Sequence, residues 1–257
     1  MSALSTPARI AEHPAPFQAA MVRAIMRDVD PKTDTRRTKG LERINEIRDD
    51  VTFSHMCSDG VAAFDVKPDA VQRLGFGSIL AKCPYGQVGD RLWVRETFAS
   101  VRPGIIAYNA DAQCGAYMGD GAGGRFWIHH GYVLESEAYH GAKEPIRTYG
   151  LKHYGGKWKP SIFMPRWASR LTLEITDIRP ERLQDISEED ALAEGIVRIP
   201  LYHHPFKVPG TDIFAASAKE AFAGLWDSIN GKKPGHSWAD NPWVRAISFR
   251  RLEAAGR

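Results

Sequence analysis

A polar stretch after the first predicted helix carries the residue types that could do chemistry. Residues 30–37 read DPKTDTRR and contain Lys32, Thr35, Arg36 and Arg37. A threonine hydroxyl attacks a carbonyl carbon once a base removes its proton, and a lysine amine can be that base when burial or neighbouring cations depress its pKa. Because Lys32 and Thr35 are three residues apart, they share a face on a helical turn but not on an extended strand. Joint chemistry of the two therefore requires this segment to be a curled loop.

Residue spacing predicts the regular elements on either side of this loop. Residues 17–26 (FQAAMVRAIM) place apolar side chains on one face of a helix. That helix should end before Pro31, because proline disfavours helical geometry at the preceding residue. Residues 91–98 (RLWVRETF) follow a Gly-Asp turn and alternate in the manner of a strand, with Leu92 and Val94 on one face.

Four further elements are expected towards the C-terminus. Residues 170–178 (RLTLEITDI) alternate as a strand. Ser187 should cap a short helix whose first turn is acidic, and Glu194 lies at its end, directly before a glycine. A second helix is predicted over 215–229, and residues 243–250 (WVRAISFR) form the last strand.

The composition is that of an ordinary soluble globular protein, with 257 residues, 43% hydrophobic and 25% charged. No run approaches the roughly 18 apolar residues that a membrane span needs, and no apolar export signal opens the chain. We therefore expect a cytoplasmic protein without a membrane partner. A net charge of +3 is small for a protein that grips a long phosphate backbone, so a nucleotide or a short RNA fits better as an anionic ligand.

Neither a metal site nor a cofactor is predicted. Cys57, Cys83 and Cys114 are far apart in the sequence, and the histidine pairs at 129–130 and 203–204 are adjacent rather than spaced along a helix face. The sequence also has no dinucleotide-binding fingerprint and no serine nucleophile elbow.

Tryptophans beside basic residues form a second functional signal. Trp93, Trp158 and Trp167 have basic neighbours in the sequence, a composition suited to stacking a nucleobase while holding phosphate or ribose. Glu96 follows the predicted Gly-Asp strand and is expected to point towards the same site. The alternative is that these tryptophans fill the hydrophobic core.

Three segments, taken in order, resemble the ASCH domain of the PUA-like superfamily. They are Lys-Thr-x-Thr-x-Arg from Lys32, the Gly-Asp turn into a strand at 89–94, and the strand leading into an acidic helix that ends at Glu194. The chain is more closely similar to a prophage group containing PFQAAMVRAI, GDRLWVRETF, MPRWASRLTLEIT, LQDISEEDALAEGI and WDSINGKKPGHSWADNPWV.

The resemblance implies an α+β fold, a small PUA-like β-barrel with flanking helices. The family's compact domain is under half this length, so large loop insertions are expected at about 40–85 and 99–165. The expected organisation is a flexible N-terminal arm over 1–16 and a single domain over 17–257.

Small members of this superfamily remove the acyl group from N4-acetylcytidine through a lysine, a threonine and a glutamate. The resemblance places these roles on Lys32, Thr35 and Glu194. We therefore expect a metal-independent amidohydrolase in which Thr35 attacks the exocyclic amide, Lys32 carries the proton and Glu194 holds Lys32 in place. The expected partner is a nucleoside or nucleobase substrate, and the residues expected to bind it are Arg36, Arg37, Trp93, Glu96, Trp158 and Trp167.

Three alternatives stay open at this point. The same residues would suit a non-catalytic module that binds RNA or a modified base, and they would also suit a ribonuclease. The third alternative has no function at this site: Lys32 and the arginines are solvated, Thr35 caps a turn, and Glu194 lies on the surface at a helix end.

Overall fold

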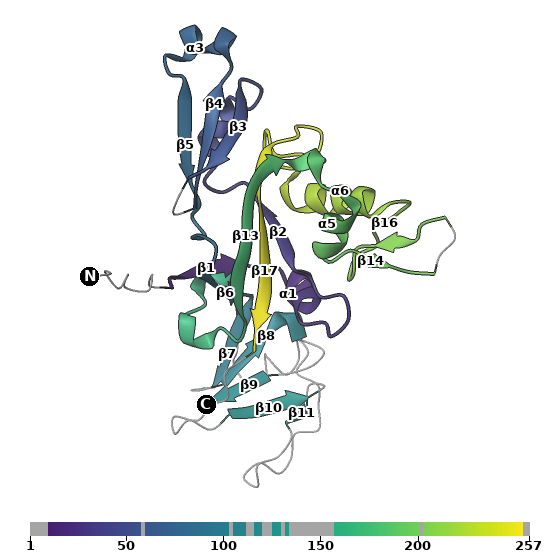
Figure 1. Ribbon diagram of the computed structural model, residues 1–257. Coiled ribbons are helices and arrows are strands. Elements are labelled where there is room, and N and C mark those ends of the chain that lie inside the picture. The colour runs from purple at the N-terminus through teal and green to yellow at the C-terminus, as the bar shows by residue number, and fades with distance from the viewer. Residues whose placement is uncertain are drawn as a thin grey trace, which may run out of the picture. The chain divides into compact units, whose positions relative to one another are not determined.

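The structure is a computed structural model that describes residues 10–57, 60–102, 105–111, 116–119, 125–129, 132–133, 157–200 and 203–253. Its described part is a mixed α+β fold, as the sequence predicts (Figure 1). The chain forms two compact units, which are described separately below. Unit 1 comprises Met1–His13, Asp28–Leu92 and Thr172–Arg257, and unit 2 comprises Pro14–Arg27 and Trp93–Leu171.

A long antiparallel strand pair is the centre of unit 1. β13 (Thr172–Arg182) pairs with β17 (Trp243–Leu252), with a bulge between Ile175 and Asp177 (Figure 1). β2 (Asp34–Arg37) pairs with the other side of β17. The full strand order is β1-β6-β13-β17-β2, in which β1 (Glu12–Pro16) and β6 (Arg91–Arg95) each contain residues of both units.

The sequence of β17 explains its central place in this sheet. Residues 243–247 of this strand are buried without interruption, which is typical of a strand covered on both faces rather than on one. β13 instead alternates before its bulge, with Leu173 and Ile175 buried and the residues between them more exposed.

Two short helices pack beside the central pair and place Glu194. α5 (Glu188–Ala193) begins at Ser187, whose hydroxyl accepts a hydrogen bond from the Asp190 N–H at 3.0 Å. It ends before Gly195, which has a positive φ of 101° that favours glycine. α6 (Ala218–Asn230) packs against α5 through a core that contains Phe222 and Trp226. Beside α6 lies a small sheet of β14 (Val197–Arg198), β15 (Phe206–Lys207) and β16 (Phe214–Ala215).

The first predicted insertion, at about 40–85, has a sheet of its own within unit 1. It contains α2 (Glu42–Glu46), β3 (Val51–Met56), β4 (Val61–Val66), α3 (Pro68–Leu74) and β5 (Ser78–Lys82), with the strands in the order β3-β4-β5. Its buried Phe64 ring meets Trp243 of β17 edge to face, with centroids 5.1 Å apart. This contact joins the core around β3, β4 and β5 to the central strand pair.

Unit 2 contains one α-helix, α1 (Ala19–Ile25), and a sheet of order β11-β10-β9-β8-β7-β12 among its described residues. The second predicted insertion, at about 99–165, supplies nearly all of this sheet. The described elements over residues 98–168 are β7 (Phe98–Arg102), β8 (Ile105–Tyr108), η2 (Asn109–Asp111), β9 (Ala116–Gly119), β10 (Arg125–His129), β11 (Tyr132–Val133), β12 (Trp158–Lys159), η3 (Ser161–Phe163) and η4 (Arg166–Ala168).

The predicted helices and the strands at 170–178 and 243–250 are confirmed, whereas the strand predicted over 91–98 ends at Arg95 as β6. Two polar segments also differ from expectation. Residues 34–37 form β2 rather than a loop, because their backbone groups pair with β17. Residues 12–16, at the end of the predicted flexible arm, form β1. No helix in the described part of the chain is long and apolar enough to cross a membrane.

The central strand supplies a direct test of this fold. Ile247 of β17 is fully buried between β13 and β2, so Ile247→Ala should lower the free energy of unfolding by about 2–5 kcal/mol. Leu80→Ala is the control, because Leu80 is 67% exposed on β5 and its truncation should cost less than about 1 kcal/mol. Urea denaturation measures both losses, and equal losses would contradict the placement of β17.

Candidate active site

Lys32 is held between the end of α5 and the central sheet. The Thr33 N–H donates to the Ala193 carbonyl at 2.9 Å, and the Thr33 carbonyl accepts from the Phe249 N–H at 2.8 Å. These two backbone bonds fix the chain on both sides of the residue that follows Lys32. The Lys32 side chain is consequently directed into the protein and has 0% exposed surface.

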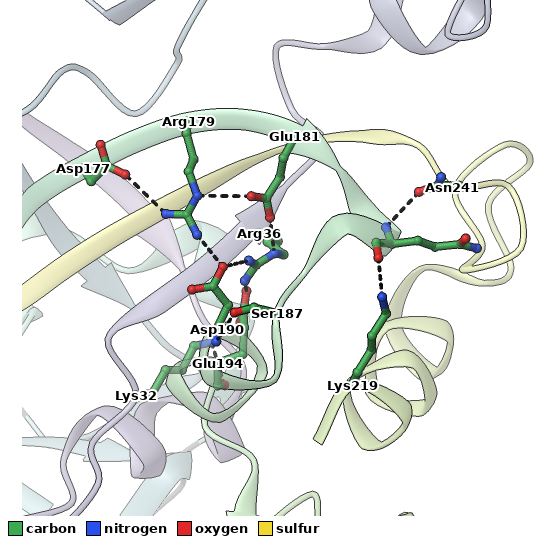
Figure 2. Close-up of polar contacts among 11 residues, drawn as sticks. Lys32, Arg36, Asp177, Arg179, Glu181, Ser187, Asp190, Glu194, Lys219 and Asn241 are labelled. Carbon is green, nitrogen blue, oxygen red and sulfur yellow. Dashed lines mark hydrogen bonds and ion pairs between the residues drawn. The ribbon is translucent and has the colours of Figure 1, made fainter. Parts of the chain in front are cut away.

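The Lys32 amine and the Glu194 carboxylate form a buried ion pair (Figure 2). Lys32 Nζ donates to Glu194 Oε2 and, at 2.8 Å, to the Glu194 backbone carbonyl. The last carbonyls of a helix have no partner within the helix, so this second bond also caps α5. The sequence prediction that Lys32 and Glu194 meet is thus matched by the geometry, although they lie 162 residues apart.

Arg36 joins this pair to further carboxylates from two elements. Its guanidinium donates to Glu181 Oε1 at 2.7 Å, to Asp190 Oδ2 at 2.9 Å and to Glu194 Oε1 at 3.3 Å. Arg179 closes the cluster on its outer side, where it contacts Glu181 at 3.1 Å and also Asp190 (Figure 2). Positive and negative groups therefore alternate from Lys32 out to Arg179.

Burial changes the acid–base properties of two groups here. Burial lowers the pKa of the Lys32 amine, and the neighbouring Glu194 carboxylate opposes that shift. When the pKa of a lysine is lowered, a larger fraction of the protein molecules carries it in the neutral form, and only the neutral amine can accept a proton. Burial also raises the pKa of Asp34, although the Ser248 hydroxyl, hydrogen-bonded to this carboxyl, opposes the shift.

The structure does not form the loop that the Lys32–Thr35 partnership requires. Thr35 lies in β2 opposite Ile247 and is 3% exposed. Successive side chains of a strand point to opposite faces, so Thr35 points away from the face on which Arg36 reaches Glu194. The contacts that join Lys32 to Glu194 do not include Thr35.

The two arginines expected to bind substrate have different surroundings. The Arg36 side chain has no exposed surface and its guanidinium contacts three carboxylates; its role in binding a substrate stays a prediction. Arg37, the next residue of β2, is half-buried, and its charge contributes to the lowered pKa of Lys32.

The other four predicted binding residues belong to unit 2. Glu96 is buried and accepts two hydrogen bonds from Arg170, at 2.8 and 3.0 Å, so its carboxylate is occupied. The Trp93 ring contacts the guanidinium of Arg95, whose central carbon lies 5.3 Å from the ring centre. Trp158 pairs with β7 as part of β12. Trp167 is 72% exposed.

Sequence reasoning missed Glu181, Arg179 and Asp190. One signal could have found the first two: after its bulge, β13 carries charged residues of alternating sign at every second position, Asp177, Arg179 and Glu181. Such side chains lie on one face of a strand. Asp190 is four residues before Glu194, which places both on one face of α5. In the described residues, no group of three His, Cys, Asp or Glu side chains could hold a metal ion.

The raised pKa of Asp34 predicts a pH-dependent stability. Between the pKa of an unfolded aspartate, about 3.9, and the higher pKa in the folded protein, the folded state binds more protons. The contribution of Asp34 to the free energy of unfolding therefore falls as the pH rises through that interval. Asp34→Asn should remove this slope in urea denaturation series from about pH 4 upward, whereas Asp69→Asn, at an exposed position, should leave it. An unchanged slope in Asp34→Asn would refute the prediction.

Comparison with known proteins identifies no relative of this chain: no family model, no curated protein and no solved structure matches it.

Proposed function

We propose that this protein is a metal-independent amidohydrolase that removes the acyl group from N4-acylated cytosine derivatives, with Lys32 as the general base. The observation that carries the proposal is the Lys32 amine itself, buried, with a lowered pKa and held by Glu194. We also propose that the fold is a PUA-like barrel, because the resemblance to ASCH domains implies this fold together with the hydrolase activity. Its support is the sheet that contains β2, β13 and β17, with α5 placing Glu194.

The proposed reaction breaks one C–N bond. An oxygen nucleophile attacks the exocyclic amide carbonyl carbon while the neutral Lys32 amine takes its proton. The bond between that carbon and N4 then breaks, the electron pair stays on N4, and the Lys32 ammonium returns the proton to it. Glu194 keeps the amine oriented in both protonation states. Hydrolysis yields the free amine of the cytosine derivative and a carboxylic acid.

The identity of the attacking oxygen is the open choice within this proposal. The resemblance assigns it to Thr35, and the strand geometry of β2 directs Thr35 away from the face of Arg36. A water molecule activated by Lys32 satisfies the same chemistry without an acyl-enzyme intermediate. Thr35 variants distinguish these two nucleophiles.

Hydrolysis of N4-acetylcytidine by the purified protein tests the proposal, with released cytidine measured by chromatography. Lys32→Ala should lower kcat/KM by roughly 10²–10⁴-fold, the usual contribution of a general base. Lys39→Ala is the matched control, because Lys39 is exposed and close in sequence. Full activity in Lys32→Ala would reject the assignment.

In the same assay, Thr35→Ala and Thr35→Ser separate the two nucleophiles. Attack by Thr35 predicts activity in the serine variant and none above background in the alanine variant. Attack by water predicts that both variants retain activity. Cleavage of RNA that is lost in Lys32→Ala, without any cytidine release, would instead support a ribonuclease.

A second candidate function, binding of single-stranded RNA, is favoured by one surface of unit 2. Phe163 and Trp167 are 68% and 72% exposed on neighbouring 3₁₀ turns. Lys157 and Lys159 are exposed just before these turns. Exposed aromatic rings beside cations are the usual means of stacking bases and holding phosphates without sequence preference.

Trp167→Ala should weaken binding to a short oligouridine by about 1–3 kcal/mol if this second function is correct. The affinity should also fall as salt rises, because phosphate contacts release counterions. Leu80→Ala, at an exposed apolar position of unit 1, serves as the control. Fluorescence titration measures the affinities, and equal affinity of both variants would exclude this surface.

A further inference from the structure

Glu194 is shared between two cations. Its Oε2 accepts from Lys32 and its Oε1 accepts from Arg36 at 3.3 Å. Both cationic side chains are fully buried, and the Glu194 side chain is nearly so. One carboxylate therefore contacts two positive charges where water does not screen them.

Arg36 is held in this position independently of Lys32. Glu181 of β13 accepts from its Nε and Asp190 of α5 accepts from its Nη2, which fixes the plane of the guanidinium. The ring of Phe222 from α6 covers it, with 5.8 Å between the guanidinium carbon and the ring centre. Three separate elements thus determine where the Arg36 charge lies.

A second cation on the same carboxylate weakens the attraction that Glu194 exerts on a proton at Lys32. Like charges close together disfavour the charged form of each, and a carboxylate that is already neutralised attracts an ammonium less strongly. Other charges act nearby as well: Asp34 and Arg37 from β2 act on Lys32, and Asp190 from α5 contacts Arg36. Arg36 differs from these because it directly contacts the carboxylate that binds Lys32.

We infer that Arg36 is a positioning residue for the Lys32 base: by occupying one oxygen of Glu194, it weakens the hold of that carboxylate on the Lys32 ammonium and so favours the neutral amine. The inference rests on the proposed function for its activity readout. The predicted effect of Arg36 on the protonation of Lys32, by contrast, depends only on the geometry of the Lys32–Glu194 pair. Arg36 is assigned a positioning role rather than a contact with substrate, because three carboxylates already occupy its guanidinium.

Three variants test this role by two readouts. One readout is the pH profile of N4-acetylcytidine hydrolysis, and the other is the titration of the Lys32 amine, followed by NMR of ¹⁵N-lysine-labelled protein without substrate. Arg36→Met should move both the acidic limb of the profile and the amine titration to higher pH by about one unit. Arg36→Lys keeps the positive charge, so it should leave both close to those of the natural sequence.

Arg179→Met is the matched control. It removes the same charge from the same cluster, but Arg179 contacts Glu181 and Asp190 rather than Glu194. It should move both readouts much less than Arg36→Met does, because Arg179 reaches Glu194 only indirectly, through Asp190 and Arg36. If the role of Arg36 is only structural, its substitution should lower the melting temperature. Arg36→Met and Arg36→Lys should then have the same pH profile.

Asp190→Asn keeps the inference testable if Arg36→Met does not fold. Asp190 is partly exposed and competes with Glu194 for Arg36. Its neutralisation should strengthen the Arg36–Glu194 contact and move the amine titration to lower pH, whereas a shift to higher pH would overturn the inference. The two proposals fail separately. Absence of cytidine release rejects the hydrolase, and an amine titration that is identical in Arg36→Met and Arg179→Met rejects the role of Arg36.

Discussion

Charge burial is the constraint on which the rest of this structure depends. A lysine and an arginine without exposed surface are strongly destabilising unless carboxylates meet them with good geometry. Those carboxylates come from β13 and from α5, so the arginine on β2 is neutralised only when all three elements are in place. The charged cluster therefore requires the pairing of β2 with β17 and the cap of α5, as the fold itself does.

Local signals in the sequence were sufficient for several helices and strands, including the helix that places Glu194, but not for β2. The apolar spacing of residues 17–26 predicts α1, and alternation predicts β6 and β13. Ser187 and the glycine after Glu194 predict both ends of α5, because capping depends on a few adjacent residues. The approach of Glu194 to Lys32 was expected only through the ASCH resemblance, since no local pattern relates residues so far apart.

Non-local pairing explains what the sequence could not predict. The segment DTRR has no apolar alternation, and it is a strand only because β17 supplies hydrogen-bond partners along it. The side on which Thr35 points follows from that pairing. The burial of Arg36 could not be predicted either, because the carboxylates that make it tolerable belong to β13 and α5. Glu96 is a similar case: its partner, Arg170, lies 74 residues away.

The complete covering of the Lys32 amine also limits how fast any small molecule can reach it. A ligand that must wait for covering groups to move apart associates more slowly than diffusion allows. Its observed association rate would level off with rising concentration at the rate of opening, instead of increasing in proportion. Rapid mixing at increasing ligand concentrations would then report a motion of the protein itself rather than the encounter with the ligand.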